Sequence, residues 1–83
     1  MQIRYLTKAI KARNKLPKND RVKVTTAINK LVDQESKSSL DIKKLQGRNG
    51  FRLRVGRYRV IYDINGTIFD IEDIFHRQKN YKH

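Results

Sequence analysis

The stretch FRLRVGRYRVIYDING, residues 51–66, constrains the fold of this chain more than any other. Apolar residues alternate with arginines over residues 51–55, which is the two-residue repeat of a strand with one buried face. Gly56–Arg57 is short enough to be a tight turn, and Asn65–Gly66 is a strong signal for a second hairpin turn. The stretch therefore predicts antiparallel strands joined by short turns, with TIFDIEDIF as the strand that follows.

The first half of the chain has a helical period instead. Residues 1–5 are interpreted as a short strand, and TKAIKARNKL then has apolar residues at helical spacing until Pro17 ends the pattern. A second apolar stripe begins after Asn19 or Asp20 and predicts a helix that runs to about residue 35. LDIKKLQG has no clear period and is interpreted as a helical turn that ends at Gly47.

The predicted order is strand, helix, helix and then three strands. The chain has 83 residues, which is enough for one hydrophobic core, so residues 1–83 are interpreted as a single domain. Two amphipathic helices need a sheet to cover, and the expected fold is therefore α+β, with both helices on one face of a twisted antiparallel sheet.

The two predicted turns set an expected register. Arg54 then lies opposite Arg59, and Arg59 lies opposite Glu72, with which it is expected to form a salt bridge. Further expected pairs are Val55 with Tyr58, Arg52 with Ile61, Tyr62 with Phe69, and Val60 with Ile71. The expected core face carries Phe51, Leu53, Val55, Tyr58, Val60, Tyr62, Phe69, Ile71 and Phe75. The other face carries Arg52, Arg54, Arg59, Asp70 and Glu72, with Ile61 and Ile74 between them. Opposed arginines cost a few tenths of a kcal/mol or more unless an anion or Glu72 neutralises them.

The charge of the chain restricts its partners. Twenty Lys and Arg against eight Asp and Glu give a net charge of +12. Such a field attracts nucleic acid, an anionic membrane surface or an acidic protein, although a basic solvated surface with no partner is also compatible. The chain has no cysteine, and its charged N-terminus lacks the apolar core of a signal peptide. A cytoplasmic protein is the expectation.

Three segments carry a resemblance to a known family. KLQG, FRLRVGRYRVIYDI and DIFHRQKNY together resemble the RelE/ParE superfamily of type II toxin–antitoxin toxins, and the tail and the RLR strand are more similar to RelE. The resemblance implies a RelE-like fold and a ribosome-dependent endoribonuclease that cleaves mRNA in the decoding site. It also implies an acidic antitoxin that neutralises the toxin and through which the complex binds operator DNA.

Site residues follow from the resemblance position by position. The implied catalytic residues are Arg52, Arg54, Arg59, His76, Arg77 and Tyr81. Relatives often have lysine at the positions of Arg52 and Arg54, and arginine does not readily release a proton, so we expect electrostatic clamping there. Whether Tyr81 or His76 is the general base stays open at this point. A solvated polar face is the alternative interpretation of the arginines.

Cleavage of RNA without a metal uses the 2′-hydroxyl as the nucleophile on the adjacent phosphate. A group must accept a proton, and forked guanidinium donors suit the negative charge of the phosphorane. Carboxylates are few and the two histidines lie near the C-terminus, so no metal or cofactor is expected. The competing function classes are a ParE-like inhibitor of DNA gyrase and a non-catalytic, basic RNA-binding domain of the same fold.

Overall fold

The computed structural model describes residues 2–78 and confirms the α+β class predicted from the sequence. Its elements, in chain order, are β1 (Gln2–Tyr5), α1 (Thr7–Lys15), α2 (Lys18–Asn29), the 3-10 turn η1 (Lys30–Val32), α3 (Gln34–Lys37), β2 (Asp41–Lys44), β3 (Phe51–Val55), β4 (Tyr58–Asn65) and β5 (Ile68–His76). Pro17 separates the first two helices, because proline has no N–H to continue α1 and suits the start of α2.

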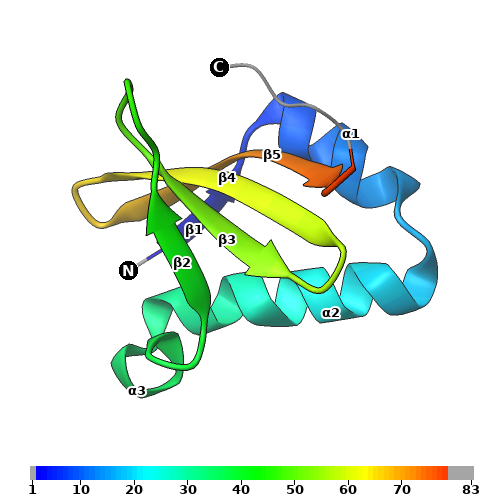
Figure 1. The fold of residues 1–83 in the computed structure, drawn as a ribbon, viewed down its shortest axis with the longest axis horizontal. Coiled ribbons are helices and arrows are strands. Elements are labelled where there is room, and N and C mark those ends of the chain that lie inside the picture. Colours follow the sequence, from blue (N-terminus) through cyan, green and yellow to red (C-terminus); the bar gives the residue numbers. More distant parts are fainter. Residues whose placement is uncertain (1, 79–83) are drawn as a thin grey trace.

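The five strands form one mixed sheet in the order β1-β5-β4-β3-β2 (Figure 1). β1 pairs in parallel with β5, which differs from the fully antiparallel sheet expected from the sequence. Residues 6–67, which include the helices, connect β1 to β5, and a connection of that length allows the two strands to run in the same direction. β2 is a strand where the sequence was interpreted as a helical turn, because pairing with β3 decides its structure. A strand of four residues at the edge of the sheet has too short an alternating pattern to be recognised from the sequence alone.

The first hairpin has the predicted register, with Val55 opposite Tyr58 and Arg54 opposite Arg59. The second hairpin does not. Asn65 pairs with Ile68, so the turn is Gly66–Thr67 and not Asn65–Gly66. Gly66 has φ +62°, at the position that a type II′ turn reserves for glycine. The Asn65 side chain donates a hydrogen bond of 2.6 Å to Asp70, which keeps Asn65 in the ladder.

A β-bulge shifts the pairing of β4 and β5 once more. Ile61 lies opposite Asp73, while Tyr62 lies opposite Ile71, so Glu72 is the extra residue on β5. The expected pairs of this hairpin are therefore wrong. Val60 lies opposite Ile74 instead of Ile71, Tyr62 opposite Ile71 instead of Phe69, and Arg59 opposite Phe75 instead of Glu72.

Buried residues of the helices and strands form one core between the helices and one face of the sheet. The cluster comprises Ala9, Val24, Ile28, Leu31, Leu53, Val60, Tyr62, Phe69, Ile71 and Ile74. Phe51, Val55 and Tyr58, which were also expected in the core, are partly buried and pack against this cluster. Ile74 takes the core position that was expected for Phe75, because the bulge reverses the alternation of β5 after Ile71.

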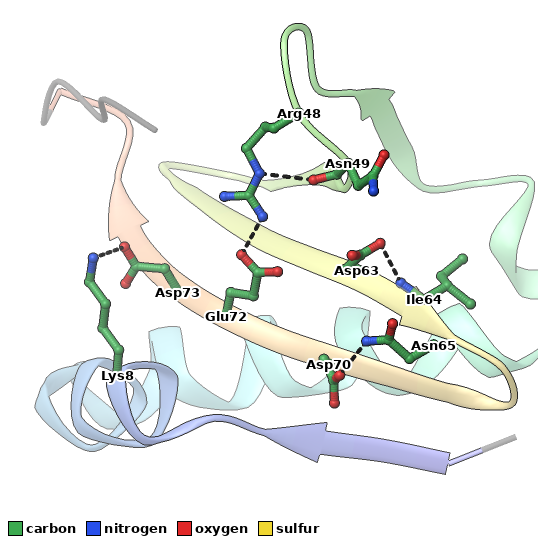
Figure 2. A network of polar contacts seen from close by, with 9 residues as sticks. All are labelled: Lys8, Arg48, Asn49, Asp63, Ile64, Asn65, Asp70, Glu72 and Asp73. Atoms are coloured by element: carbon green, nitrogen blue, oxygen red, sulfur yellow. Dashed lines mark hydrogen bonds and ion pairs between the residues drawn. The ribbon is translucent and has the colours of Figure 1, made fainter.

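The face of the sheet that lies away from α2 carries charged side chains (Figure 2). Arg52 pairs with Ile61 and Arg59 pairs with Phe75, so both arginines and both apolar residues share this face. We call it the arginine face.

Candidate functional site

The arginine face holds two opposed guanidinium groups at its centre. Arg54 and Arg59 are direct cross-strand partners in the β3–β4 ladder, as the sequence predicted. Arg52 is on the same face, one pleat away, and its side chain is 22% exposed. Like charges directly opposite each other destabilise a ladder. The fold therefore keeps a local concentration of positive charge that it does not need for packing.

Two donors of this cluster lack hydrogen-bond partners. The Nε atoms of Arg52 and Arg59 are buried, and neither has a partner within the part of the chain that the structure describes. Among residues 2–78, no ion pair involves Arg54 or Arg59. Arg52 is 3.6 Å from Asp41, whose side chain is 56% exposed, so this pair is long and solvated. Two buried donors of the cluster are thus unpaired, and Arg54, which is exposed, is the arginine that an incoming anion can reach directly.

The carboxylates of β5 are neutralised from outside β3 and β4. Glu72 does not bind Arg59, as was expected, but accepts a hydrogen bond of 2.6 Å from Arg48 in the β2–β3 loop. The salt bridge expected from the sequence is absent, since Phe75 and not Glu72 lies opposite Arg59 and Glu72 binds Arg48 instead. Lys8 in α1 lies 3.3 Å from the carboxylate of Asp73.

Asp70 has the most complete set of partners. The Arg4 guanidinium donates two hydrogen bonds to it, of 2.6 and 2.9 Å, and Asn65 donates a third (Figure 2 draws the Asn65 contact). These bonds, chiefly the one from Arg4, lower the pKa of Asp70 below its ordinary value. Asp70 and Asp73 are each only 5% exposed, so both carboxylates need such partners. Arg4 and Lys8 neutralise these two carboxylates, which form no ion pair with Arg54 or Arg59.

His76 does not join the arginines. Its ring lies edge-on to Tyr58, with 5.6 Å between the ring centroids, and Tyr58 donates a hydrogen bond of 2.8 Å to Asp20 of α2. Tyr58 packs against the core cluster, so His76 is on the helix side of the sheet, opposite the arginine face. Its Nδ1 accepts a hydrogen bond of 3.2 Å from the Gln78 backbone.

The described residues include the first part of the HRQKNYKH tail. The backbone N–H of Arg77 donates a hydrogen bond of 2.7 Å to the carbonyl of Arg57, which fixes the end of β5 beside the β3–β4 turn. The Arg77 side chain is exposed. Tyr81, the other residue considered as a general base, lies outside the described residues.

Two residues near the cluster were missed by sequence reasoning. Asp41 was missed because β2 was not recognised as a strand, although its alternation of charged residues with Ile42 was the available signal. Arg48 contacts a residue 24 positions away, and such a contact has no signature in a single sequence.

A cavity of about 390 Å³ lies elsewhere, at the end of the sheet beside α2. It is lined by Asp20, Lys23, Val24, Val55, Gly56, Arg57 and Tyr58. The hydrogen bond to Asp20 is the main reason that the pKa of Tyr58 is raised. Of the residues singled out from the sequence for chemistry, none lines this cavity, so it is distinct from the arginine face.

Within residues 2–78, no three acidic or histidine side chains are grouped in a way that could hold a metal ion. Over the same residues, every helix is too short or too polar to span a membrane.

Comparisons with known proteins agree with this architecture. Residues 3–81 match the model of the family described as the ParE toxin of type II toxin–antitoxin systems, parDE. Toxin RelE3 of Methanocaldococcus jannaschii is 37% identical, over 63% of this chain and 68% of that protein.

Solved structures show the same fold. The toxin–antitoxin complex RelB–RelE from Methanococcus jannaschii matches with a TM-score of 0.74 and 27% identity, over 89% of this chain and 90% of the matched chain. The archaeal RelE–RelB complex from Pyrococcus horikoshii OT3 matches with a TM-score of 0.77 and 25% identity, over 95% and 97%. The chain therefore belongs to the ParE toxin family of type II toxin–antitoxin systems, within the RelE/ParE superfamily.

Proposed function

We propose that this toxin is a RelE-type endoribonuclease that cleaves mRNA in the decoding site of the ribosome and so halts translation and growth. The observation that carries the proposal is the pair Arg54 and Arg59, which are opposed in the ladder and form no ion pair among residues 2–78, even though the exposed Asp41 lies opposite Arg54 in β2. The similarity to Toxin RelE3 and to two RelE chains in solved complexes supports the RelE assignment.

The proposed chemistry needs no metal. The 2′-hydroxyl of the substrate attacks its own 3′ phosphate, which forms a 2′,3′-cyclic phosphate and releases a 5′-hydroxyl. Arg52, Arg54 and Arg59 stabilise the extra negative charge of the phosphorane, because guanidinium groups donate forked hydrogen bonds to phosphate oxygens. Arg77 is a further clamp at the end of β5.

The proposed reaction also needs a general base that accepts the proton of the 2′-hydroxyl. His76 carries an imidazole, the side chain that enzymes use most often for proton transfer, but its ring packs on Tyr58 at the opposite face of the sheet. We therefore assign the base role to Tyr81, with His76 as the rival. An unperturbed tyrosine has a pKa near ~10, so Tyr81 acts near neutrality only if neighbouring cations lower that value.

The proposed partner is an acidic antitoxin that covers the arginine face or displaces the tail. Two of the similar structures are RelE–RelB complexes, and the charge of +12 favours an acidic binding segment. Association should be electrostatically steered and should slow as salt is added. Binding of the complex to operator DNA would then be a property of the antitoxin. The site of action is the cytoplasm, where ribosomes translate.

Inhibition of DNA gyrase is the second candidate, because the matching family model is that of the ParE toxin. The two candidates differ in their target and not in their fold.

One experiment separates these functions. Purified toxin is added to a ribosome programmed with a defined mRNA, and primer extension maps the cleavage; a parallel reaction contains gyrase and supercoiled plasmid. We expect cuts within the codon in the decoding site, and loss of those cuts with Arg59→Ala. Intact mRNA together with gyrase-trapped DNA breaks would assign the chain to the gyrase inhibitors. Intact mRNA and intact DNA would leave a basic binding domain without catalysis.

A further inference from the structure

The β2–β3 loop, residues 45–50, is held close against the sheet. The N–H of Leu45 donates a hydrogen bond of 3.0 Å to the carbonyl of Gly50 and closes the loop. Gly50 has φ +123°, and a Cβ at this position would lie 3.1 Å from the carbonyl oxygen of Tyr62 in β4. Only glycine permits this approach of two backbones. The loop therefore ends at a fixed position beside β4.

Arg48 extends from this loop to β5, two strands beyond β3 in the sheet (Figure 2). Its Nη2 donates a hydrogen bond of 2.6 Å to Glu72, and its Nε donates one of 2.8 Å to the carbonyl of Asn49. The side chains of Arg48 and Glu72 are 30% and 24% exposed, so the pair is more protected than a surface ion pair.

The bulge directs Glu72 into this contact. Glu72 has no cross-strand partner, because Ile61 pairs with Asp73 and Tyr62 pairs with Ile71. A bulge re-aims a side chain in this way. Asp73 shares the arginine face, since its partner Ile61 is also the partner of Arg52. Glu72 is thus adjacent in sequence to Asp73, whose ladder row contains Ile61 and Arg52, and Arg59 lies one pleat further along the same face.

The Glu72 carboxylate has a cation that binds it, Arg48, and a second cation further along the same face of the sheet, Arg59. Arg48 binds it in the observed structure, whereas Arg59 lies on the same sheet with a buried Nε that has no partner among the described residues. The acidic residues Asp70 and Asp73 show the same arrangement, since Arg4 and Lys8 bind them from outside β3 and β4.

We propose that Arg48 is a positioning residue that sequesters the Glu72 carboxylate and so keeps Arg54 and Arg59 available to phosphate. The inference rests on the proposed role of the arginine face as a phosphate site. Arg48 would act through Glu72 and not by touching the substrate. When Arg48 is removed, Glu72 turns to Arg59 and competes with phosphate for the same guanidinium donors.

The test is a titration with inorganic phosphate, followed by NMR at the Nε–H signals of Arg54 and Arg59. We expect Arg48→Ala to weaken phosphate binding about two- to fivefold, the range of a single partly exposed ion pair. Arg48→Lys keeps a cation for Glu72 and should bind as the wild type does. Glu72→Gln alone should have little effect, because the carboxylate it removes is already occupied. Glu72→Gln in the Arg48→Ala background should restore wild-type affinity.

The design separates sequestration from a change in overall charge. Lys18→Ala removes one exposed cation without freeing a carboxylate, and its loss of affinity sets the effect of charge alone. If Glu72→Gln increases affinity equally in the wild type and in Arg48→Ala, the effect is additive and the inference is wrong. It is also wrong if Arg48→Ala matches Lys18→Ala, or if phosphate does not shift the arginine signals of the wild type.

Failure of the proposed function gives a different pattern. The titration requires no ribosome, so a protein that leaves mRNA intact but shows the expected rescue retains the positioning inference and loses the nuclease. A protein that cleaves mRNA and shows no rescue retains the nuclease and loses the role of Arg48.

Discussion

Arg54 and Arg59 face each other across the β3–β4 ladder, and within residues 2–78 neither is bound by a carboxylate. Each carboxylate of β5 is instead bound by a cation from β1, α1 or the β2–β3 loop. The acidic side chains of β5 are therefore paired with cations from other elements, and they do not neutralise the two central arginines. A protein of this size has little stability to spare, and the cost of opposing these two charges supports the proposal that they bind phosphate.

Relief of the like-charge contact should stabilise the fold. We expect Arg54→Gln to raise the free energy of unfolding by a few tenths of a kcal/mol at low salt, because it removes one of two opposed charges. The gain should shrink at about 1 M salt, where the Debye length is only ~3 Å. Urea denaturation at both salt concentrations measures this. Arg57→Gln, in the exposed turn, is the control for net charge and should give a smaller gain. A net loss of stability in Arg54→Gln at low salt contradicts the interpretation.

Loss of Arg59 should lower activity without a change in pH dependence. Removal of one preorganised donor to a developing oxyanion typically costs about 10²–10³ in rate. Guanidinium stays protonated across the accessible range, so Arg59→Ala should scale the whole pH–rate profile down without moving its optimum. Single-turnover cleavage of mRNA on the programmed ribosome measures the profile. A displaced optimum would mean that Arg59 tunes a neighbouring acid or base.

His76 and Tyr81 can be separated by paired substitutions. Because His76 packs against Tyr58 on the helix side, His76→Gln should keep most of the single-turnover rate. Tyr81→Phe should lose activity and also one limb of the pH–rate profile, as expected of a proton acceptor. The reverse result transfers the base role to His76. Mild effects in both variants would mean that ribosomal groups supply the proton transfer and that this chain is mainly a clamp.

The bonds to Asp70 predict a specific acid sensitivity. Arg4 lowers the pKa of Asp70 in the folded state below the unfolded value of about 3.9. The stabilisation is therefore present above about pH 4 and is lost as the pH falls through the lowered pKa. Asp70→Asn should be less stable than the wild type at pH 7, and the difference should shrink below about pH 4. Urea midpoints measured against pH give the comparison. Arg4→Ala should show the same dependence, since its hydrogen bond is the main cause of the shift.

Gly50 should tolerate substitution less than Gly47 does. Both have positive φ, of +123° and +77°, but only Gly50 has atoms of the fold within reach of a new Cβ. Gly47→Ala should cost about 1–2 kcal/mol, the strain of a left-handed L-residue. Gly50→Ala should cost more, because the Tyr62 carbonyl and the Leu45 side chain must also move. Thermal and urea unfolding measure both. Equal costs would mean that the loop yields without strain.

The sequence by itself determined the elements that local chemistry controls. The alternation in residues 51–55 and the glycine at position 56 predicted β3, the first turn and the facing of Arg54 with Arg59. Those features depend on neighbours a few residues apart, so a single sequence contains them. The same alternation separated the arginines from the core residues of β3 and β4.

Only the tertiary structure shows the features that depend on pairing between residues far apart in the sequence. The bulge at Glu72 moved Ile74 into the core and His76 to the helix side, although no local pattern in β5 marks an extra residue. Asn65 joined the ladder because its amide binds Asp70, which moved the second turn by one position. The shifted register also placed Phe75 opposite Arg59, and Glu72 binds Arg48 from a loop 24 residues earlier, a contact that no local pattern indicates.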